Sequence, residues 1–403
     1  MNSRRAVPHE RVKALGSMPE ASPKSGRDRV GFEFCSDEFK RMICGEEENL
    51  DPLYEIVVEA DCFNLNAHEA AVFLEHGVET GDESFDNRPT LLFTTQPFFE
   101  EEEGRGGYAV AIKGVTLDTL KTKTLHRSRN LANGGTLGMD GRLYFCFQGA
   151  KVESESSEIK MFQHPAGVSS VDPKDWSDWR VEVDGWGPNL VSFNSPNDVV
   201  ISRKSGSVFF TDPSYAAAQG YGPPAALGDW VWRYDPWDNT VSVVADNFSK
   251  PNGLCFSPDE SKIYVTDTGY VVGDGTQDRR LPRTIYVFDV EHKKKQLLTN
   301  RRLLYVADSG VPDGIKVDSN GIIYTGCADG VHVVHPDTGA LLGKVLIIGN
   351  DGGAANLCFG RGKYSNTLYI LAEAAIVALT FQDNNTYGAQ VGHEGGEGKK
   401  NTI

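Results

Sequence analysis

The sequence lacks any run of apolar residues long enough to cross a membrane, for which about 20 consecutive apolar residues are needed. The N-terminal segment MNSRRAVPHERVKALG begins with basic residues, but no apolar stretch of the kind found in secretory signals follows them. We therefore expect a cytoplasmic protein with no membrane partner.

Excess positive charge and paired cysteines are also missing. The 403 residues include 40 Lys and Arg against 56 Asp and Glu, a formal net charge of −16. Binding to nucleic acid requires a basic face, so we expect no nucleic-acid partner, whereas a divalent cation suits an acidic chain. The 7 cysteines are odd in number and form no C-x-x-C pair, which argues against a disulfide framework and a zinc site.

Common catalytic motifs are absent as well. The sequence contains no G-x-S-x-G nucleophile elbow, no P-loop, no G-x-G-x-x-G after a predicted strand and no H-E-x-x-H pair. Any chemistry must therefore come from residues that are distant in the sequence.

What the sequence does contain is a repeat. A polar residue, which we call an opener, begins a short apolar run, and an aromatic-rich strand follows after a turn. The six openers are Glu69, Asn133, Asn197, Asn252, Asp313 and Asn356. Further strands follow in each unit, including 158–163 (EIKMFQ) in the second, between Gly, Asp, Asn and Pro turns. Such units are typical of propeller blades, so the sequence predicts an all-β, six-bladed β-propeller rather than a sandwich or barrel.

The repeat also sets the expected boundaries. Residues 1–36 lack periodicity and are predicted to form a disordered leader, residues 37–387 the propeller, and residues 388–403 a flexible, Gly-rich tail. A short helix is expected from Glu38. The strand at 53–60 precedes the first unit, and we expect it to supply the missing outer strand of the last blade and close the ring.

In a propeller the innermost strand of each blade lines a central channel, so the openers would meet at one mouth of it. They comprise one Glu, one Asp and four Asn, and Ca²⁺ prefers oxygen ligands of this kind. Asn and Asp are also common turn residues, which is the alternative explanation for any single opener. Glu69 is the discriminating residue, because Glu is not a turn former.

Three other titratable residues lie within the same repeat phrases as the openers. Asp212 and Asp267 follow aromatic strands and are interpreted as turn or strand-edge carboxylates. His68 precedes Glu69 in the same predicted strand, so its side chain is expected to point away from the ring. A role for His68 in proton transfer is left open.

Long phrases within the repeat resemble one family. The segments SPNDVV with VFFTDPSY, KPNGLCFSPDESKIYVTDTG and VPDGIKVDSNGIIYTG are similar to the gluconolactonase and senescence-marker-protein family of six-bladed propellers. HEAAVF followed by LFTT resembles its fungal lactonohydrolase branch. The resemblance covers residues 40 to 385 and implies a hydrolase that opens the ring of a small lactone, an aldonolactone or similar.

The resemblance also implies one divalent metal ion, with Ca²⁺ the first choice and Mg²⁺, Mn²⁺, Zn²⁺ and Fe²⁺ as alternatives. Its ligands would be Glu69, Asn252 and Asp313, with Asn197 as a further ligand or a substrate contact. The metal would polarise the lactone carbonyl and activate water. Asp313, as a ligand that is also a carboxylate, is the candidate catalytic base. Asn133, Asn197 and Asn356 are the candidate substrate-binding residues.

The sequence departs from the family's pattern at two places, and three alternative functions remain. Animal members carry an Arg two residues before the Asn of the PND phrase, where this chain has Ser195, and the segment 216–230 reads as an inserted loop that could cover the channel mouth. The alternative functions are a paraoxonase-like arylesterase, a strictosidine-synthase-like propeller enzyme and a non-catalytic propeller scaffold.

Overall fold

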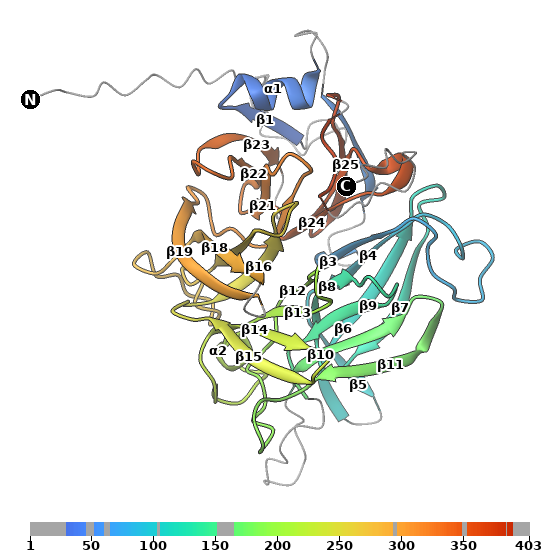
Figure 1. Cartoon of the computed structure of the whole chain (residues 1–403). Coiled ribbons are helices and arrows are strands. Elements are labelled where there is room, and N and C mark those ends of the chain that lie inside the picture. The colour runs from blue at the N-terminus through green and yellow to red at the C-terminus, as the bar shows by residue number, and fades with distance from the viewer. Residues whose placement is uncertain are drawn as a thin grey trace, which may run out of the picture.

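The chain folds into six antiparallel sheets arranged as blades around a central channel (Figure 1). The structure is a computed structural model, and it describes residues 30–45, 52–59, 65–102, 105–150, 165–292, 296–348, 353–383 and 385–389. The predicted all-β, six-bladed propeller is confirmed. Apart from three strands described below, the strands of each blade pair in sequence order, starting from the innermost strand.

The first three blades run from β3 to β15. Blade 1 contains β3 (Ala67–Leu74), β4 (Thr90–Thr95), β6 (Arg105–Thr116) and β7 (Thr122–Ser128). The strand β5 (Phe98–Glu102) also pairs with β6 and extends this blade as a hairpin. Blade 2 contains β8 (Ala132–Leu137), β9 (Leu143–Phe147), β10 (Gly167–Asp172) and β11 (Asp175–Val183). Blade 3 contains β12 (Val199–Ile201), β13 (Val208–Asp212), β14 (Trp230–Asp235) and β15 (Thr240–Ala245).

The other three blades complete the ring. Blade 4 contains β16 (Pro251–Phe256), β17 (Lys262–Asp267), β18 (Thr284–Glu291) and β19 (Leu297–Val306). Blade 5 contains β20 (Ile315–Val317), β21 (Ile323–Cys327), β22 (Gly330–Val334) and β23 (Leu341–Ile347). Blade 6 contains β24 (Asn356–Phe359), β25 (Thr367–Ala372) and β26 (Ala375–Thr380), with the short helix η3 (Gly362–Tyr364) after β24.

The N-terminal part of the chain closes blade 6, as predicted. The strand β2 (Leu53–Glu59) pairs antiparallel with β26 and becomes the outer strand of that blade. The predicted helix is α1 (Asp37–Cys44), capped by the Ser36 hydroxyl, which accepts a hydrogen bond from the amide of Phe39.

Two boundary predictions and one strand prediction need correction. The strand β1 (Val30–Phe34) pairs with β23 as a fifth strand of blade 5, so the predicted leader is too long; residues 1–29 lie outside the described part of the chain. Gly388 and Ala389 are tied to β20 and its turn by backbone pairing, so the predicted tail starts too early. The third strand of blade 2 is β10, whereas 158–163 lies outside the described residues.

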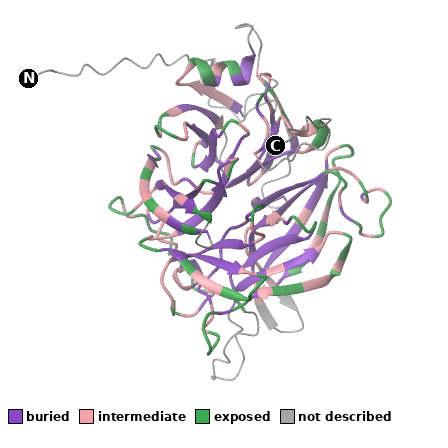
Figure 2. Ribbon diagram, in the orientation of Figure 1, coloured by how far each residue is buried: buried purple, intermediate pink, exposed green. Residues whose placement is uncertain are grey.

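The core lies between the blades, where the faces of neighbouring sheets pack (Figure 2). One cluster joins Val72, Leu92 and Ile112 of blade 1 to Phe145 and Phe147 of blade 2. Each blade is covered on both faces by its neighbours, so apolar side chains are expected on both faces of its inner strands. No disulfide joins any two of the six described cysteines, and Cys146, Cys255 and Cys358 are buried, as predicted. No helix in the described residues is long and apolar enough to span a bilayer.

Closure by β2 gives a testable consequence. Val57 of β2 is buried in the cluster that joins blades 6 and 1, whereas Leu53 on the same strand is 53% exposed. Val57→Asp places a charge in an apolar interface and should lower the free energy of unfolding by about 3 kcal/mol or more. Leu53→Asp is the matched control and should change it by less than about 1 kcal/mol. Equal, small effects in urea titrations would show that β2 does not close the ring.

Candidate active site

Five of the six openers line one cavity at the end of the channel where the innermost strands begin. The cavity has a volume of ≈ 260 Å³, and its wall includes Glu69, Asn133, Asn197, Asn252 and Asp313. They come from blades 1 to 5, so residues separated by up to 244 positions meet only because the ring closes. Asn356 of blade 6 is the exception.

Three openers are fixed by hydrogen bonds from threonines of the neighbouring blade. The hydroxyl of Thr94 in β4 donates to the backbone carbonyl of Asn133, 3.1 Å away. Thr211 in β13 donates to the carbonyl of Asn252 at 2.7 Å, and Thr266 in β17 donates to that of Asp313 at 3.0 Å. The three hydroxyl residues are Thr94, Thr211 and Thr266, and each is fully buried. The second strand of one blade thus sets the position of the opener in the next. We did not predict this role, although Thr recurs in the FTT, FTD and VTD phrases.

Glycine after an opener lets the next opener approach. A Cβ atom on Gly134 would lie 2.5 Å from the carbonyl oxygen of Asn197, and one on Gly253 would lie 2.4 Å from that of Asp313. Real Cβ atoms do not come this close, so these two positions require glycine. The N-G phrases are therefore packing signals of the ring as well as turn signals.

Asp212 and Asp267 hold the loops that lead into two openers. The carboxylate of Asp212 accepts the amide hydrogens of Asn194 and Ser195, at 3.0 and 2.7 Å. Asp267 accepts those of Ser249 and Lys250, both at 2.9 Å. Both carboxylates are fully buried, and burial raises the pKa of Asp212 to about 7 against the effect of its two amide donors. As predicted, Asp212 and Asp267 are strand-edge carboxylates, at the ends of β13 and β17, and their hydrogen bonds also hold the loops that lead to Asn197 and Asn252.

Glu69 and His68 both face the cavity. The prediction that His68 points away is wrong, because the register with β4 shifts between Ala67 and Glu69. A β-bulge places two residues opposite one and breaks the alternation of side chains. Ala70, the next residue, has φ = 53°, a conformation that non-glycine residues rarely adopt.

His68 is held by a partner that the sequence did not reveal. Its Nδ1 lies 2.5 Å from Oε1 of Glu373, and Gln96 lies beside both side chains. Burial alone would lower the pKa of His68, but the charge and hydrogen bond of Glu373 outweigh it and raise the pKa to about 9. The ring is therefore positively charged at neutral pH and faces the carboxylates of the site.

Asn356 lies behind Glu69 rather than on the cavity wall. Its Nδ2 donates to Oε2 of Glu69, and its Oδ1 accepts the amide hydrogen of Leu357. Both ends of the Asn356 amide are therefore engaged, and the residue is 1% exposed. This position suits a residue that orients Glu69, and not the direct substrate contact predicted from the sequence.

Two acidic side chains share the buried site. Burial raises the pKa of Glu69 well above its usual range, and the neighbouring Asp313 carboxylate raises it further. Burial also raises the pKa of Asp313 to about 6, although the charge of His68 opposes the shift. The two carboxylates repel each other in a medium of low dielectric, so a bound cation would relieve both.

The residues present fit a divalent cation. Oδ1 of Asn197 and Oδ1 of Asp313 are buried, and neither has a hydrogen-bond partner in the described part of the chain. Buried oxygens without partners are costly, and both belong to residues of the cavity wall. Carboxylate and amide oxygens are the ligands that hard cations such as Ca²⁺ prefer. Glu69, Asn197, Asn252 and Asp313 would hold it.

The predicted covering segment reaches the cavity. It includes the end of α2 (Tyr215–Ala218) and continues to residue 230, and Gln219 and Tyr221 from it line the cavity together with Tyr215. Ser195 is fully buried beside this segment. The Ser195 hydroxyl donates to the carbonyl of Pro213 at 2.5 Å and accepts the amide hydrogen of Ala216 at 3.1 Å.

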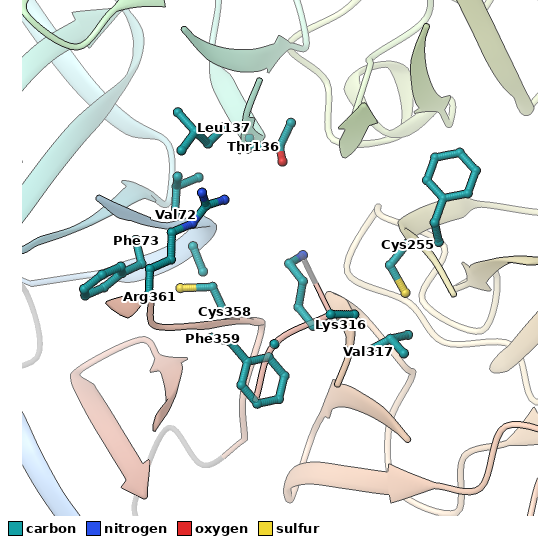
Figure 3. Close-up of a pocket in the computed structure, with 15 residues that line it drawn as sticks. Val72, Phe73, Thr136, Leu137, Cys255, Lys316, Val317, Cys358, Phe359 and Arg361 are labelled. Carbon is teal, nitrogen blue, oxygen red and sulfur yellow. The ribbon is translucent and has the colours of Figure 1, made fainter. Parts of the chain in front are cut away.

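A smaller cavity, of ≈ 60 Å³, lies further along the innermost strands (Figure 3). Its wall includes Val72, Thr136, Cys255 and Cys358, and the side chains of Lys316 and Arg361 carry its positive charge. None of the openers lines it. The two cavities therefore differ in charge: the larger one is acidic and the smaller one basic.

Among the described residues, a second group could hold a metal ion, formed by Asp308, Asp329 and His332. The ammonium group of Lys344 lies 2.7 Å from Oδ1 of Asp308 and 3.0 Å from Oδ2 of Asp329. His332 Nε2 lies 2.7 Å from Oδ1 of Asp329. A lysine ammonium already neutralises this group, which makes it a weaker candidate than the opener ring.

The repulsion in the metal-free site predicts a pH-dependent stability. Because the pKa of Asp313 rises from its ordinary 3.8 to about 6 on folding, ionised Asp313 destabilises the fold above that pH, and this penalty fades towards pH 3.8. In chelator at about pH 7.5, Asp313→Asn should raise the free energy of unfolding by on the order of 1–2 kcal/mol. The gain should shrink at about pH 4.5.

Urea titrations at the two pH values measure this, with Asp308→Asn as the control. The side chain of Asp308 is 61% exposed, so its replacement should have little effect at either pH. A loss of stability in Asp313→Asn at the higher pH would contradict the electrostatic account.

The chain is similar to known lactone hydrolases over part of its length. It is 33% identical to lactonohydrolase oryH of Aspergillus oryzae over 208 residues, which cover 48% of this chain and 40% of that protein. It is 31% identical to a gluconolactonase of Zymomonas mobilis over 257 residues, which cover 62% of each. The chain thus spans less than two thirds of either relative.

A solved structure agrees with the fold. A gluconolactonase from Xanthomonas campestris superimposes with a TM-score of 0.63 at 20% identity, covering 88% of this chain and 96% of that one. Residues 164–374, more than half of the chain, match the family described as the SMP-30/gluconolactonase/LRE-like region. With the six-bladed fold and the ring of openers, this match shows that the chain belongs to the SMP-30/gluconolactonase/LRE-like family.

Proposed function

We propose that this protein is a metal-dependent lactonase that opens the ring of a small lactone with an activated water. The observation that carries the proposal is the juxtaposition of Glu69, Asn197, Asn252 and Asp313 on one cavity, with two of their oxygens buried and unpartnered in the described residues. The relatives named lactonohydrolase and gluconolactonase support the reaction class.

The four ring residues would hold the ion, with Ca²⁺ as the first choice. A bound divalent cation supplies Lewis-acid polarisation of the lactone carbonyl and lowers the pKa of a nearby water. The protein needs no nucleophile of its own for this chemistry.

The chain's own residues then move the protons and bind the substrate. Asp313 accepts the proton of the water as its oxygen attacks the carbonyl carbon. Asn133 and Asn197 donate amide hydrogens to the carbonyl oxygen as it gains negative charge. The ring C–O bond then breaks, and the released alkoxide takes up the proton held by Asp313, which gives a hydroxy acid and restores the Asp313 carboxylate.

His68 fits a supporting role beside this reaction. It lines the cavity, carries a positive charge at neutral pH and is oriented by Glu373. A charged donor held in this way stabilises negative charge on the substrate. Asn356 would act through Glu69 as a positioning residue.

The activity can be tested with chelation and variants. Treatment with a chelator should abolish hydrolysis of a lactone panel, and a divalent cation should restore it. Asp313→Ala should lower kcat/KM by at least about 1,000-fold, because it removes both a ligand and the base, while circular dichroism shows an intact fold. Asp308→Asn, in the group around Lys344, is the control and should retain activity.

The outcomes separate the alternatives. Full turnover by Asp313→Ala would refute the role of Asp313 as ligand and base. Loss of activity in Asp308→Asn alone would indicate that the metal binds at Asp308, Asp329 and His332 instead. Activity that survives metal removal would favour a metal-independent, strictosidine-synthase-like enzyme. Aryl ester hydrolysis without lactone hydrolysis would favour a paraoxonase-like esterase, and the absence of all these activities a scaffold.

A further inference from the structure

The cavity wall includes apolar side chains that the proposed reaction does not use. Pro97 and Val110 come from blade 1, Val271 and Val311 from loops around blades 4 and 5, and Tyr221 from the covering segment. A substrate that consisted only of a polar, hydroxylated ring would leave this apolar wall against polar groups. Burial of apolar surface favours binding in proportion to the area covered, so the wall selects for an apolar part of the substrate.

From Tyr221, a row of three aromatic rings extends outward from the cavity. The centroid of Tyr221 lies 5.8 Å from that of Tyr108 on β6, and Tyr108 meets Phe99 of β5 edge to face, with centroids 5.7 Å apart. Phe99 and Tyr108 are cross-strand partners in the β5–β6 hairpin. Phe99 is 63% exposed and Tyr108 is 47% exposed, so the row runs from the cavity to solvent. Rings at these distances provide stacking and edge-to-face contacts for a further ring.

The charge of the cavity also favours a neutral substituent. No Lys or Arg is among the described residues that line it, and the side chain of His68, which also lines it, contacts Glu373. Glu69 and Asp313 are acidic. Away from the proposed metal ion, a substituent that carries phosphate or carboxylate would therefore meet no Lys or Arg partner, whereas a neutral substituent has no such cost.

Ser195 anchors the segment that carries Tyr215 and Tyr221. Its hydroxyl donates to the carbonyl of Pro213 and accepts the amide hydrogen of Ala216. It is buried, so it cannot contact the substrate itself.

We propose that this site takes a neutral lactone with an aromatic or other apolar substituent, which lies along Tyr221, Tyr108 and Phe99. The inference rests on the proposed lactonase function and names its substrate class. The lactone carbonyl binds at the opener ring, and the substituent extends along the aromatic row towards the surface.

The test compares δ-valerolactone with its derivative that carries a phenyl group on the ring carbon next to the ring oxygen. The wild-type protein should show a kcat/KM at least about tenfold higher for the phenyl derivative. Tyr221→Ala should reduce that preference about tenfold, and Tyr221→Phe, which keeps the ring, should preserve it. Phe99→Ala should reduce it about threefold and is safe for folding, because Phe99 is largely exposed.

Trp237→Ala is the matched control, because Trp237 is an aromatic residue that is 84% exposed and does not line the cavity. The Trp237→Ala variant should prefer the phenyl derivative as strongly as the wild-type protein does. An equal rate for both lactones, or a preference unchanged in both Tyr221→Ala and Phe99→Ala, would overturn the inference while the lactonase function stands. Hydrolysis of neither lactone nor of any other lactone would instead refute the proposed function.

One further outcome concerns the surface. Size-exclusion chromatography of wild type and Tyr108→Ala shows whether the exposed rings join two copies of the chain. A dimer that becomes a monomer in the variant, with the substrate preference unchanged, would assign the row to self-association and overturn the proposal.

Discussion

The hydrogen bond from a buried threonine to the backbone of the next blade is the interaction on which the site depends. Thr94, Thr211 and Thr266 each use it to fix an opener on the neighbouring innermost strand. Each such bond contributes only about 0.5–1.5 kcal/mol, but leaving a buried carbonyl unpaired costs about 1–3 kcal/mol. Because the bonds hold the backbone, the opener side chains remain available to the cavity. Blade packing and site geometry are therefore the same structural problem.

The site itself works against the stability of the fold. Burial and mutual repulsion raise the pKa values of Glu69 and Asp313, and two cavity oxygens lack partners in the described residues. The surrounding ring compensates through apolar contacts between blades and through its closure by β2. A destabilised acidic cluster on a rigid scaffold is suited to binding a cation, because binding releases the stored repulsion.

Much of this could be predicted from the sequence, for an identifiable reason. The opener repeat implies equivalent positions in a ring, so it predicted the propeller and a meeting of all six openers, of which five line the cavity. It could not predict the bulge that turns His68 inward or the partnership with Glu373, because these depend on register and on contacts across the closing blades. Asn356 has the same repeat position as its neighbours, yet it contacts Glu69. The β1 strand was missed although Val30, Phe32 and Phe34 alternate with Gly31 and Glu33, because the strand is short and its partner β23 lies near the other end of the chain.

The central claim is that the openers of neighbouring blades bind one divalent cation. The most direct measurement is a crystal structure of the protein grown with Mn²⁺ in place of Ca²⁺, with the ion located by its anomalous scattering. The account predicts a single strong peak within about 2.6 Å of oxygens from Glu69, Asn252 and Asp313. A peak at Asp308, Asp329 and His332 instead, or none in the cavity at saturating Mn²⁺, would contradict it.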